Sequence, residues 1–238
     1  MNDASIATRV AGLDWDALER SLWDVGYAKT RPVLTPEECE ALVALYADDG
    51  LFRSRVDMAR HRFGEGDYKY LAHPLPPLVV ALREAMYPRL AALANAWEQA
   101  LGSTTRYPDD LAGLAALCRR HGQTKPTPLL LHYEQGGYNC LHQDLYGEVA
   151  FPLQITGFLS RPGVDYDGGD FLLVEQRPRA QSRGEALHTE QGELLMFPTR
   201  HRPVRGARGF HRTTMRHGVS TITRGSRYTL GIIFHDAK

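Results

Sequence analysis

The stretch MRHGVSTITRGSRYTLGIIF, residues 215–234, has the pattern of two short strands separated by a glycine-containing turn. Similar apolar or alternating runs precede it: PLLLHYE (128–134), YNCLHQD (138–144), FPLQITGFLS (151–160), GGDFLLVEQ (168–176) and GELLMFP (192–198). Short strands at this spacing are typical of a β-sandwich, jelly roll or barrel, and the absence of interrupting helical runs disfavours a βαβ sheet. We therefore expect an α+β protein with a β core at residues 126–238.

The first half of the chain, residues 1–125, has mainly helical patterns. Apolar residues recur at helical spacing in four runs, at 13–26, 35–50, 77–102 and 108–122. Pro88 lies inside the third run, where it is expected to kink the helix or divide it in two. Because no Ser/Gly-rich linker separates the halves, we expect a single domain, residues 1–238, with the helices packed outside the β core.

Residues 51–76, LFRSRVDMARHRFGEGDYKYLAHPLP, fit neither helical nor strand periodicity well. The segment is basic, aromatic and contains glycine, which predicts a loop or a loose hairpin. Such a segment could serve as a lid or contact a substrate. The alternative is an ordinary surface connection.

The formal net charge is +0, but the charges are unevenly distributed. The first fifty residues are acidic, whereas the basic residues between 177 and 227 are almost all arginine. A cluster within that region could form a basic face for a phosphate-bearing partner; its members are Arg200, Arg202, Arg205, Arg208 and Arg212. Alternatively, these arginines pair with the acidic N-terminal part or lie on a solvated face.

Three cysteines, Cys39, Cys118 and Cys140, are widely spaced and odd in number. This pattern fits neither a disulfide framework nor a zinc finger, so we expect a reducing compartment and a cytoplasmic protein. The N-terminal residues lack the pattern of a signal peptide, and no apolar run is long enough for a membrane span.

The run YNCLHQD holds a histidine and a carboxylate two positions apart. Because side chains alternate along a strand, His142 and Asp144 are expected on one face, close enough to bind one ion. Cys140 shares that face, and we interpret it as small core filler.

A third ligand must come from elsewhere in the chain. His188 lies in a charged stretch, and His201 and His211 lie among arginines in an expected loop. His217 differs, because it stands at the expected start of a strand. Two histidines and one carboxylate on one face of an octahedron leave three positions free, which suits non-haem Fe(II) that binds a bidentate cosubstrate and O₂.

Arg227 follows His217 by ten residues, on an apolar strand. An arginine inside a barrel is costly unless it meets an anion, and its planar fork matches a carboxylate. Thr229 shares its face, and its hydroxyl could donate to the same carboxylate.

This combination of His142-x-Asp144, His217 and Arg227 resembles the Fe(II)/2-oxoglutarate-dependent dioxygenases. RHGVSTITRGSRYTLGIIF is similar to the C-terminal signature of that superfamily, and YDGGDFLLVE and GELLMFP fall where it has its middle strands. The resemblance covers about residues 126–236. It implies a double-stranded β-helix, a jelly-roll variant, and an oxidation of substrate C–H bonds that consumes O₂ and 2-oxoglutarate and releases succinate and CO₂.

The resemblance also implies residue roles. His142, Asp144 and His217 would be the iron ligands, and Arg227 would hold the distal carboxylate of 2-oxoglutarate with help from Thr229. A tyrosine is directed at the cosubstrate in some members, including AlkB-type enzymes. Two residues could take that place here, Tyr133 and Tyr138.

The substrate is less defined. LHQDLYGE and the arginine-rich segment loosely resemble a bacterial family described as oxidising alkyl groups on damaged DNA, in which case the arginines could bind phosphates and residues 51–76 could hold a flipped base. Against this, AlkB-type enzymes have a second arginine where this chain has Ile233, and the His217-to-Arg227 spacing is nearer the prolyl-hydroxylase branch. Hydroxylation of a protein side chain or small molecule is therefore an alternative.

A non-oxidative, cupin-like metal protein is a further alternative, which Arg227 disfavours. Residues just after the metal motif, Leu145, Tyr146 and Glu148, are expected where a substrate approaches.

Overall fold

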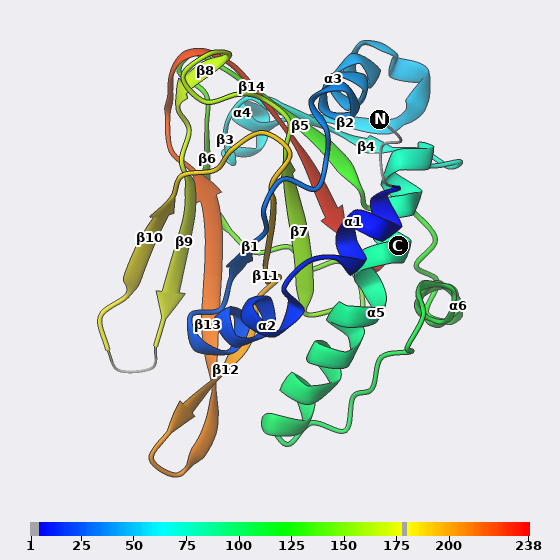
Figure 1. Cartoon of the computed structure of the whole chain (residues 1–238), viewed down its shortest axis with the longest axis vertical. Helices are drawn as coiled ribbons and strands as arrows, with labels where there is room; N and C mark the ends of the chain where they lie inside the picture. Colours follow the sequence, from blue (N-terminus) through cyan, green and yellow to red (C-terminus); the bar gives the residue numbers. More distant parts are fainter. Residues whose placement is uncertain (1–4, 178–179) are drawn as a thin grey trace.

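Two antiparallel sheets form the body of the computed structural model, which describes residues 5–177 and 180–238 (Figure 1). The larger sheet has the strand order β1-β11-β7-β14-β5-β4-β2, with β8 paired to β14. The smaller has the order β10-β9-β13-β6-β3, with β12 paired to β13. Helices combined with two facing antiparallel sheets confirm the expected α+β class and the double-stranded β-helix.

The strands of the larger sheet come from both halves of the chain. They are β1 (Ala28–Lys29), β2 (Phe52–Asp57), β4 (Asp67–Leu71), β5 (Leu129–Glu134), β7 (Leu153–Phe158), β8 (Tyr166–Gly168), β11 (Leu194–Pro198) and β14 (Ile222–Ile233). The smaller sheet contains β3 (Gly64–Glu65), β6 (Tyr138–His142), β9 (Phe171–Gln176), β10 (Arg183–Leu187), β12 (His201–Gly206) and β13 (Gly209–Val219).

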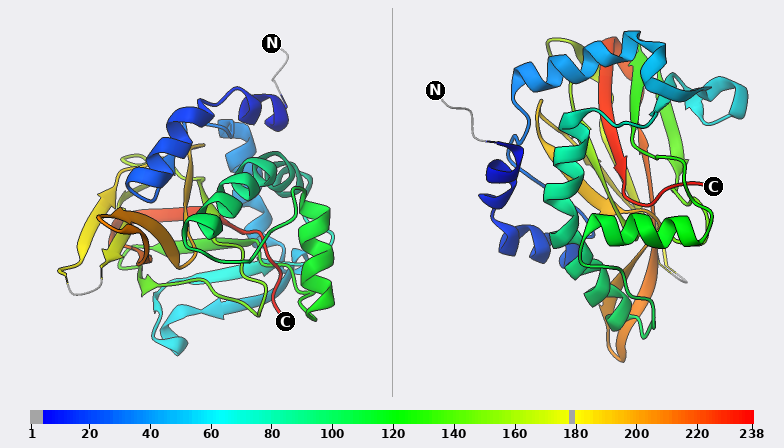
Figure 2. Two further views of the ribbon diagram at one scale, coloured as in Figure 1. Left: turned by 90° about the horizontal axis from the view of Figure 1, so that it is seen from below. Right: turned by 90° about the vertical axis from the view of Figure 1, so that its right-hand side faces the viewer.

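All helices except the short one at residues 58–61 cover the outer face of the larger sheet (Figure 2). The helices are α1 (Ile6–Ala11), α2 (Trp15–Asp24), α3 (Pro36–Ala44), α4 (Met58–His61), α5 (Pro77–Ala100) and α6 (Leu111–Arg120), with 3₁₀ turns at Leu45–Ala47 and Asp49–Leu51. One apolar cluster joins Met86 and Trp97 of α5 to Leu230 and Ile232 of β14. Because side chains alternate on β14, Arg227 and Thr229 point the other way, into the space between the sheets.

Helix α5 is continuous from Pro77 to Ala100 with Pro88 inside it, so the expected division into two helices is wrong. A proline inside a helix costs about 3 kcal/mol. Buried side chains on both sides of it, including Met86 and Leu90, pack into the same core cluster, and this packing offsets that cost.

Residues 51–76 contribute three strands, so of the two expected forms the hairpin is confirmed and the loop is wrong. β2 pairs with β4, β4 pairs with β5, and the short β3 crosses to pair with β6. The strand pattern is obscured because the outward side chains are charged and paired, as in Arg55 with Asp67 and Lys69 with Asp49. From this segment, Arg62, Phe63, Tyr68 and Tyr70 line the central pocket.

The expected loop around His201 and His211 is instead a hairpin of β12 and β13. It projects beyond the body of the molecule (Figure 1). Few other segments pack against it there, so its strands do not need an apolar face. His217 lies near the end of β13 rather than at the start of a strand.

Candidate active site

A cavity of about 420 Å³ lies between the two sheets. Its wall is built from β4, β5, β6, β7, β13 and β14 together with the segment after β6. His142, Asp144, His217, Arg227 and Thr229 all line it. The sandwich thus brings together residues that are far apart in the sequence.

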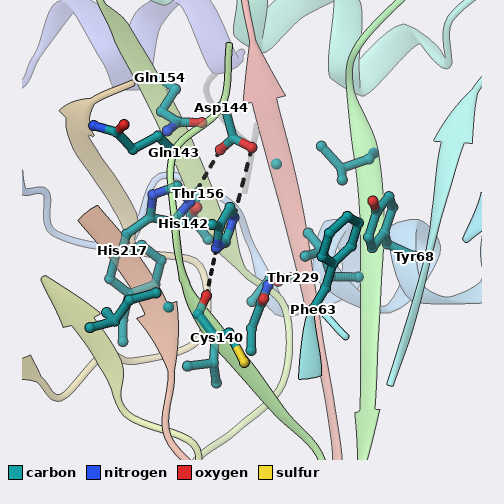
Figure 3. A pocket seen from close by; sticks show the side chains of 18 of the residues that line it. Phe63, Tyr68, Cys140, His142, Gln143, Asp144, Gln154, Thr156, His217 and Thr229 are labelled. Atoms are coloured by element: carbon teal, nitrogen blue, oxygen red, sulfur yellow. Dashed lines mark hydrogen bonds and ion pairs between the residues drawn. The ribbon is translucent and has the colours of Figure 1, made fainter. Parts of the chain in front are cut away.

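Three side chains converge at one end of this cavity (Figure 3). One ligand atom each from His142, Asp144 and His217 lies within 4.8 Å of the others. His217 Nε2 is 3.1 Å from Asp144 Oδ2, and His142 Nε2 is 3.7 Å from Asp144 Oδ1. Two imidazoles and one carboxylate at this spacing form a donor set suited to a divalent iron ion.

The two histidines face each other across a strand pair, since His217 on β13 is the register partner of His142 on β6. Asp144 lies beyond the end of β6 instead of on it, so the expectation of a shared strand is wrong. Its backbone N–H donates to Thr199 O at 3.3 Å, which turns the chain across the sheet end and still directs the carboxylate at both imidazoles.

Backbone contacts fix the ligands. His142 Nδ1 lies 2.8 Å from Cys140 O, so this nitrogen carries the proton and Nε2 is left for a metal. Between the ligands, Gln143 Nε2 donates to Met215 O at 2.9 Å and to Arg200 O at 3.3 Å. Residues 140–144 are therefore attached to β13 and the start of β12.

The electrostatics favour the metal-binding forms of both groups. Burial and the neighbouring His217 lower the pKa of His142, which keeps its imidazole neutral. Burial alone would raise the pKa of Asp144, but the adjacent His217 and His142 outweigh it and lower that pKa well below its ordinary range. Neutral imidazole and ionised carboxylate are the forms that coordinate divalent ions.

Arg227 lies deep in the same cavity and is 1% exposed. None of its guanidinium nitrogens has a hydrogen-bond partner among the described residues. Three aromatic rings surround the group, each with its centroid 5.7 Å away, from Tyr133, Phe158 and Tyr166. A buried charge left unpaired costs several kcal/mol, so the geometry calls for an anion here.

Tyr133 and Tyr138 differ in position. Tyr133 is fully buried, lines the cavity and accepts a hydrogen bond from Asn139 Nδ2 at 3.1 Å. Burial raises its pKa to about 12, so the phenol keeps a proton that it can donate into the cavity. Tyr138 is 38% exposed and does not line the cavity. Of these two tyrosines, Tyr133 is therefore the one whose side chain lines the cavity.

Cys140 is exposed at the cavity wall, so its interpretation as core filler is wrong. Among the strands of the described residues, only the two-residue β3 lies beyond β6, and the β6–β13 register shifts between His217 and Val219. The sheet edge is therefore irregular at this point and leaves the thiol uncovered.

Several cavity residues were not predicted as site residues. Gln154 and Thr156 of β7 and Tyr70 of β4 all line the wall. The signal for the first two was two polar residues at alternating positions in an otherwise apolar strand. Tyr146, expected where a substrate approaches, lines the cavity and also donates to Asp144 Oδ1 at 3.1 Å. Glu148 is exposed and pairs with Lys238 and His121, away from the cavity.

The arginine-rich region divides into paired and unpaired members. Arg202 is 2% exposed and bound to Glu175, so it cannot bind phosphate as expected. Arg177 and Arg183 pair with acids two residues away in the sequence, and Arg224 pairs with Asp167 on the neighbouring β8. None of these three pairs is with the acidic N-terminal part. The arginines at 200, 205, 208 and 212 are exposed and form no ion pair with a described residue. We call residues 200–212 the basic hairpin.

Within residues 5–177 and 180–238, no helix combines the length and the apolar character that crossing a bilayer requires.

Residues 66–237 match the model of a family described as an oxygenase catalysing oxidative methylation of damaged DNA. Two uncharacterized proteins from two strains of Mycobacterium tuberculosis are each 51% identical to the chain over 164 residues. The match covers 69% of this chain and 70% of each of theirs.

Solved structures share the architecture. A Pseudomonas putida prolyl-4-hydroxylase matches with a TM-score of 0.53 at 16% identity, over 91% of this chain and 96% of its own. A Trichoplax adhaerens prolyl hydroxylase in complex with a hypoxia inducible factor peptide gives 0.55 at 15% identity, over 96% and 91%. A 2OG-Fe(II) oxygenase family oxidoreductase from Burkholderia pseudomallei gives 0.52 at 16% identity, over 99% and 94%. At these identities the likeness concerns the fold.

Proposed function

Because the chain belongs to the oxygenase family described as catalysing oxidative methylation of damaged DNA, we propose that its substrate is an alkylated base in nucleic acid. The resemblance to Fe(II)/2-oxoglutarate-dependent oxygenases is confirmed, and the chain is an oxidoreductase of that class. The proposal concerns its substrate and the roles of its residues.

The buried, unpartnered guanidinium of Arg227 is the observation that carries the assignment of the pocket. It lies in the same cavity as the metal-binding cluster, so a dicarboxylate reaching from the metal could neutralise it. His142, Asp144 and His217 would hold the iron. Arg227 would hold the distal carboxylate of 2-oxoglutarate, with a hydroxyl from Thr229 and the phenol of Tyr133 beside it.

When bound, iron and 2-oxoglutarate supply with O₂ the oxidising power that inserts one oxygen atom into a substrate C–H bond and yields succinate and CO₂. The side chains of the pocket hold the metal ligands and Arg227 in position and exclude water from them. Phe171 and Phe197 pack against the His217 ring at centroid distances of 5.8 and 4.8 Å, and Tyr133 and Phe158 enclose Arg227.

Oxidation of an N-methyl carbon would convert the methyl group into a hydroxymethyl group on the same nitrogen. That group leaves as formaldehyde, and the nitrogen recovers a hydrogen. The reaction would thus restore an unmodified base without cutting the nucleic-acid backbone.

Two surface features support a nucleic-acid partner. In the basic hairpin, exposed guanidinium groups form no ion pair with the described part of the chain, which suits them to phosphates. The cavity mouth is apolar and aromatic: Phe63 is 48% exposed and Leu141 39% exposed, and Figure 3 shows Phe63 and Tyr68 on the side away from His217. Exposed apolar groups of this kind suit contact with the face of a base.

Formaldehyde release tests the substrate. The wild-type protein with Fe(II) and 2-oxoglutarate should release formaldehyde from N-methylated oligonucleotides, whereas undamaged oligonucleotides should release none. An Asp144→Ala variant is the matched control, because it removes one expected ligand at the cavity. No release from any methylated base would overturn the substrate assignment.

Peptide hydroxylation is the second candidate, favoured by the ten-residue spacing between His217 and Arg227. A parallel reaction with proline-containing peptides therefore belongs in the same assay. Succinate formation that depends on a peptide and not on methylated DNA would establish this candidate instead. The cytoplasmic location expected from the cysteine pattern stays a prediction.

A further inference from the structure

We propose that Tyr146 is a positioning residue, held by Tyr70, that fixes the orientation of the Asp144 carboxylate toward the two histidines of the metal site. This inference rests on the proposed metal site at His142, Asp144 and His217. It concerns how the carboxylate is held before any ion binds.

The contacts form a short chain of hydroxyl groups. Tyr146 Oη donates to Asp144 Oδ1 at 3.1 Å, and the Tyr70 hydroxyl lies 3.0 Å from the Tyr146 hydroxyl. A phenol has one proton to donate. Since the proton of Tyr146 goes to Asp144, Tyr70 must donate its own proton to Tyr146.

Both tyrosines are held in place by the surrounding structure. Tyr70 lies on β4, is 8% exposed, and carries the guanidinium carbon of Arg53 4.4 Å above its ring centroid. The carbonyl of Tyr146 accepts from Gln123 Nε2 at 3.1 Å. Gln123 Oε1 in turn accepts from the backbone N–H groups of Glu148 and Val149. Gly147 has φ +80°, and a Cβ there would lie 2.4 Å from the Gln123 side chain.

The hydrogen bond from Tyr146 determines how the Asp144 carboxylate is oriented. Its Oδ1 is engaged by Tyr146, whereas Oδ2 lies 3.1 Å from His217 Nε2. Oδ1 is also 3.7 Å from His142 Nε2, so each carboxylate oxygen faces one of the two histidines. The hydrogen bond from Tyr146 to Oδ1 therefore fixes the rotation of the carboxylate between the two imidazoles. A carboxylate held in one orientation keeps a ligand atom ready for an ion shared with both histidines. β4 of the 51–76 segment thus supports the metal ligand from the opposite sheet.

Cobalt binding to the metal-free protein tests this role without relying on turnover. Tyr146→Phe keeps the ring and removes the hydroxyl, so the Co(II) dissociation constant should rise about 10- to 100-fold and the visible Co(II) absorption should change in shape. Tyr107→Phe is the matched control. The Tyr107 hydroxyl donates to Ala150 O at 2.8 Å in the same segment but does not touch Asp144. It should bind Co(II) like the wild type.

Two further variants separate the possible outcomes. Tyr70→Phe should weaken Co(II) binding less than Tyr146→Phe. If the Tyr146 variant fails to fold, weaker Co(II) binding by the Tyr70 variant tests the positioning role in its place. Unchanged Co(II) affinity and absorption in the tyrosine variants, with binding abolished in Asp144→Ala, would overturn the positioning role alone. Unchanged binding in Asp144→Ala would instead overturn the metal site itself.

Discussion

Two arginines, Arg202 and Arg227, are almost equally buried and yet have opposite surroundings. Arg202 is paired with Glu175 Oε2 at 2.6 Å and also donates to Trp23 O at 2.9 Å. Arg227 has no hydrogen-bond partner among the described residues. The apolar strand around Arg227 allowed its role to be predicted from sequence. The pairing of Arg202 could not be predicted, because Glu175 lies on a strand that only the folded sheet brings near.

This contrast gives a prediction of opposite signs. Arg227→Met should raise the free energy of unfolding of the cofactor-free protein by about 1–4 kcal/mol, because it removes an uncompensated buried charge. Arg202→Met should lower it by about 3–5 kcal/mol, because it strands the buried Glu175 carboxylate. Urea unfolding of both variants measures this.

The same Arg227 variant should lose at least about 100-fold in 2-oxoglutarate affinity, roughly 3 kcal/mol, by calorimetric titration of the Mn(II)-loaded protein. The assigned role would be contradicted if the Arg227→Met variant were less stable than the wild type, or if it bound 2-oxoglutarate with the wild-type affinity.

At the scale of elements, strand patterns were readable wherever one face of a strand is apolar, as in β7, β11 and β14. They were unreadable in β2 and β4, whose outer charges are paired, and in the basic hairpin, which projects beyond the sheets. The sequence pattern predicts one strand through the whole metal motif, whereas the strand ends at His142. Tertiary contacts of the following segment override it.

The basic hairpin supports a prediction on binding. Replacing Arg205, Arg208 and Arg212 by Ser should weaken binding to single- and double-stranded oligonucleotides at low salt. If each contacts one phosphate, the slope of log affinity against log salt should shrink by about 2–3 units. Fluorescence anisotropy over a salt series measures this slope. The exposed positions should leave stability within about 0.5 kcal/mol of the wild type, and an unchanged slope would exclude the hairpin from the interface.

At the scale of the whole molecule, helices cover one face of the larger sheet and leave the space between the sheets for the cavity (Figure 2). The fold class and this covering could be predicted, because apolar helical runs in one half and strand runs in the other must bury their faces together. The order of the strands could not, since register and pairing depend on contacts between distant segments. The C-terminal end also packs inward, where His235 is fully buried.

The burial of His235 predicts a loss of stability in mild acid. Burial chiefly, with Arg83 nearby, lowers its pKa from 6.5 to about 4 in the folded protein. As the pH falls, His235 is protonated in the unfolded chain before it is protonated in the folded protein. Stability is therefore unaffected by this group above about pH 6.5 and decreases as the pH falls toward 4. At pH 5 the free energy of unfolding is therefore about 2 kcal/mol lower than at neutral pH.

His235→Asn should show a smaller loss between pH 7 and pH 5, because its amide oxygen can still accept from Phe151 N–H but does not titrate. Urea unfolding at the two pH values measures the difference. An equal loss in both proteins would mean that His235 is not the group responsible.

Oxygen-dependent conversion of 2-oxoglutarate into succinate tests the central claim most directly, measured for the wild type and for His217→Ala with Fe(II) and methylated oligonucleotide. The account predicts succinate from the wild type and none above background from the variant. No succinate from the wild type with any substrate, or equal succinate from His217→Ala, would contradict it.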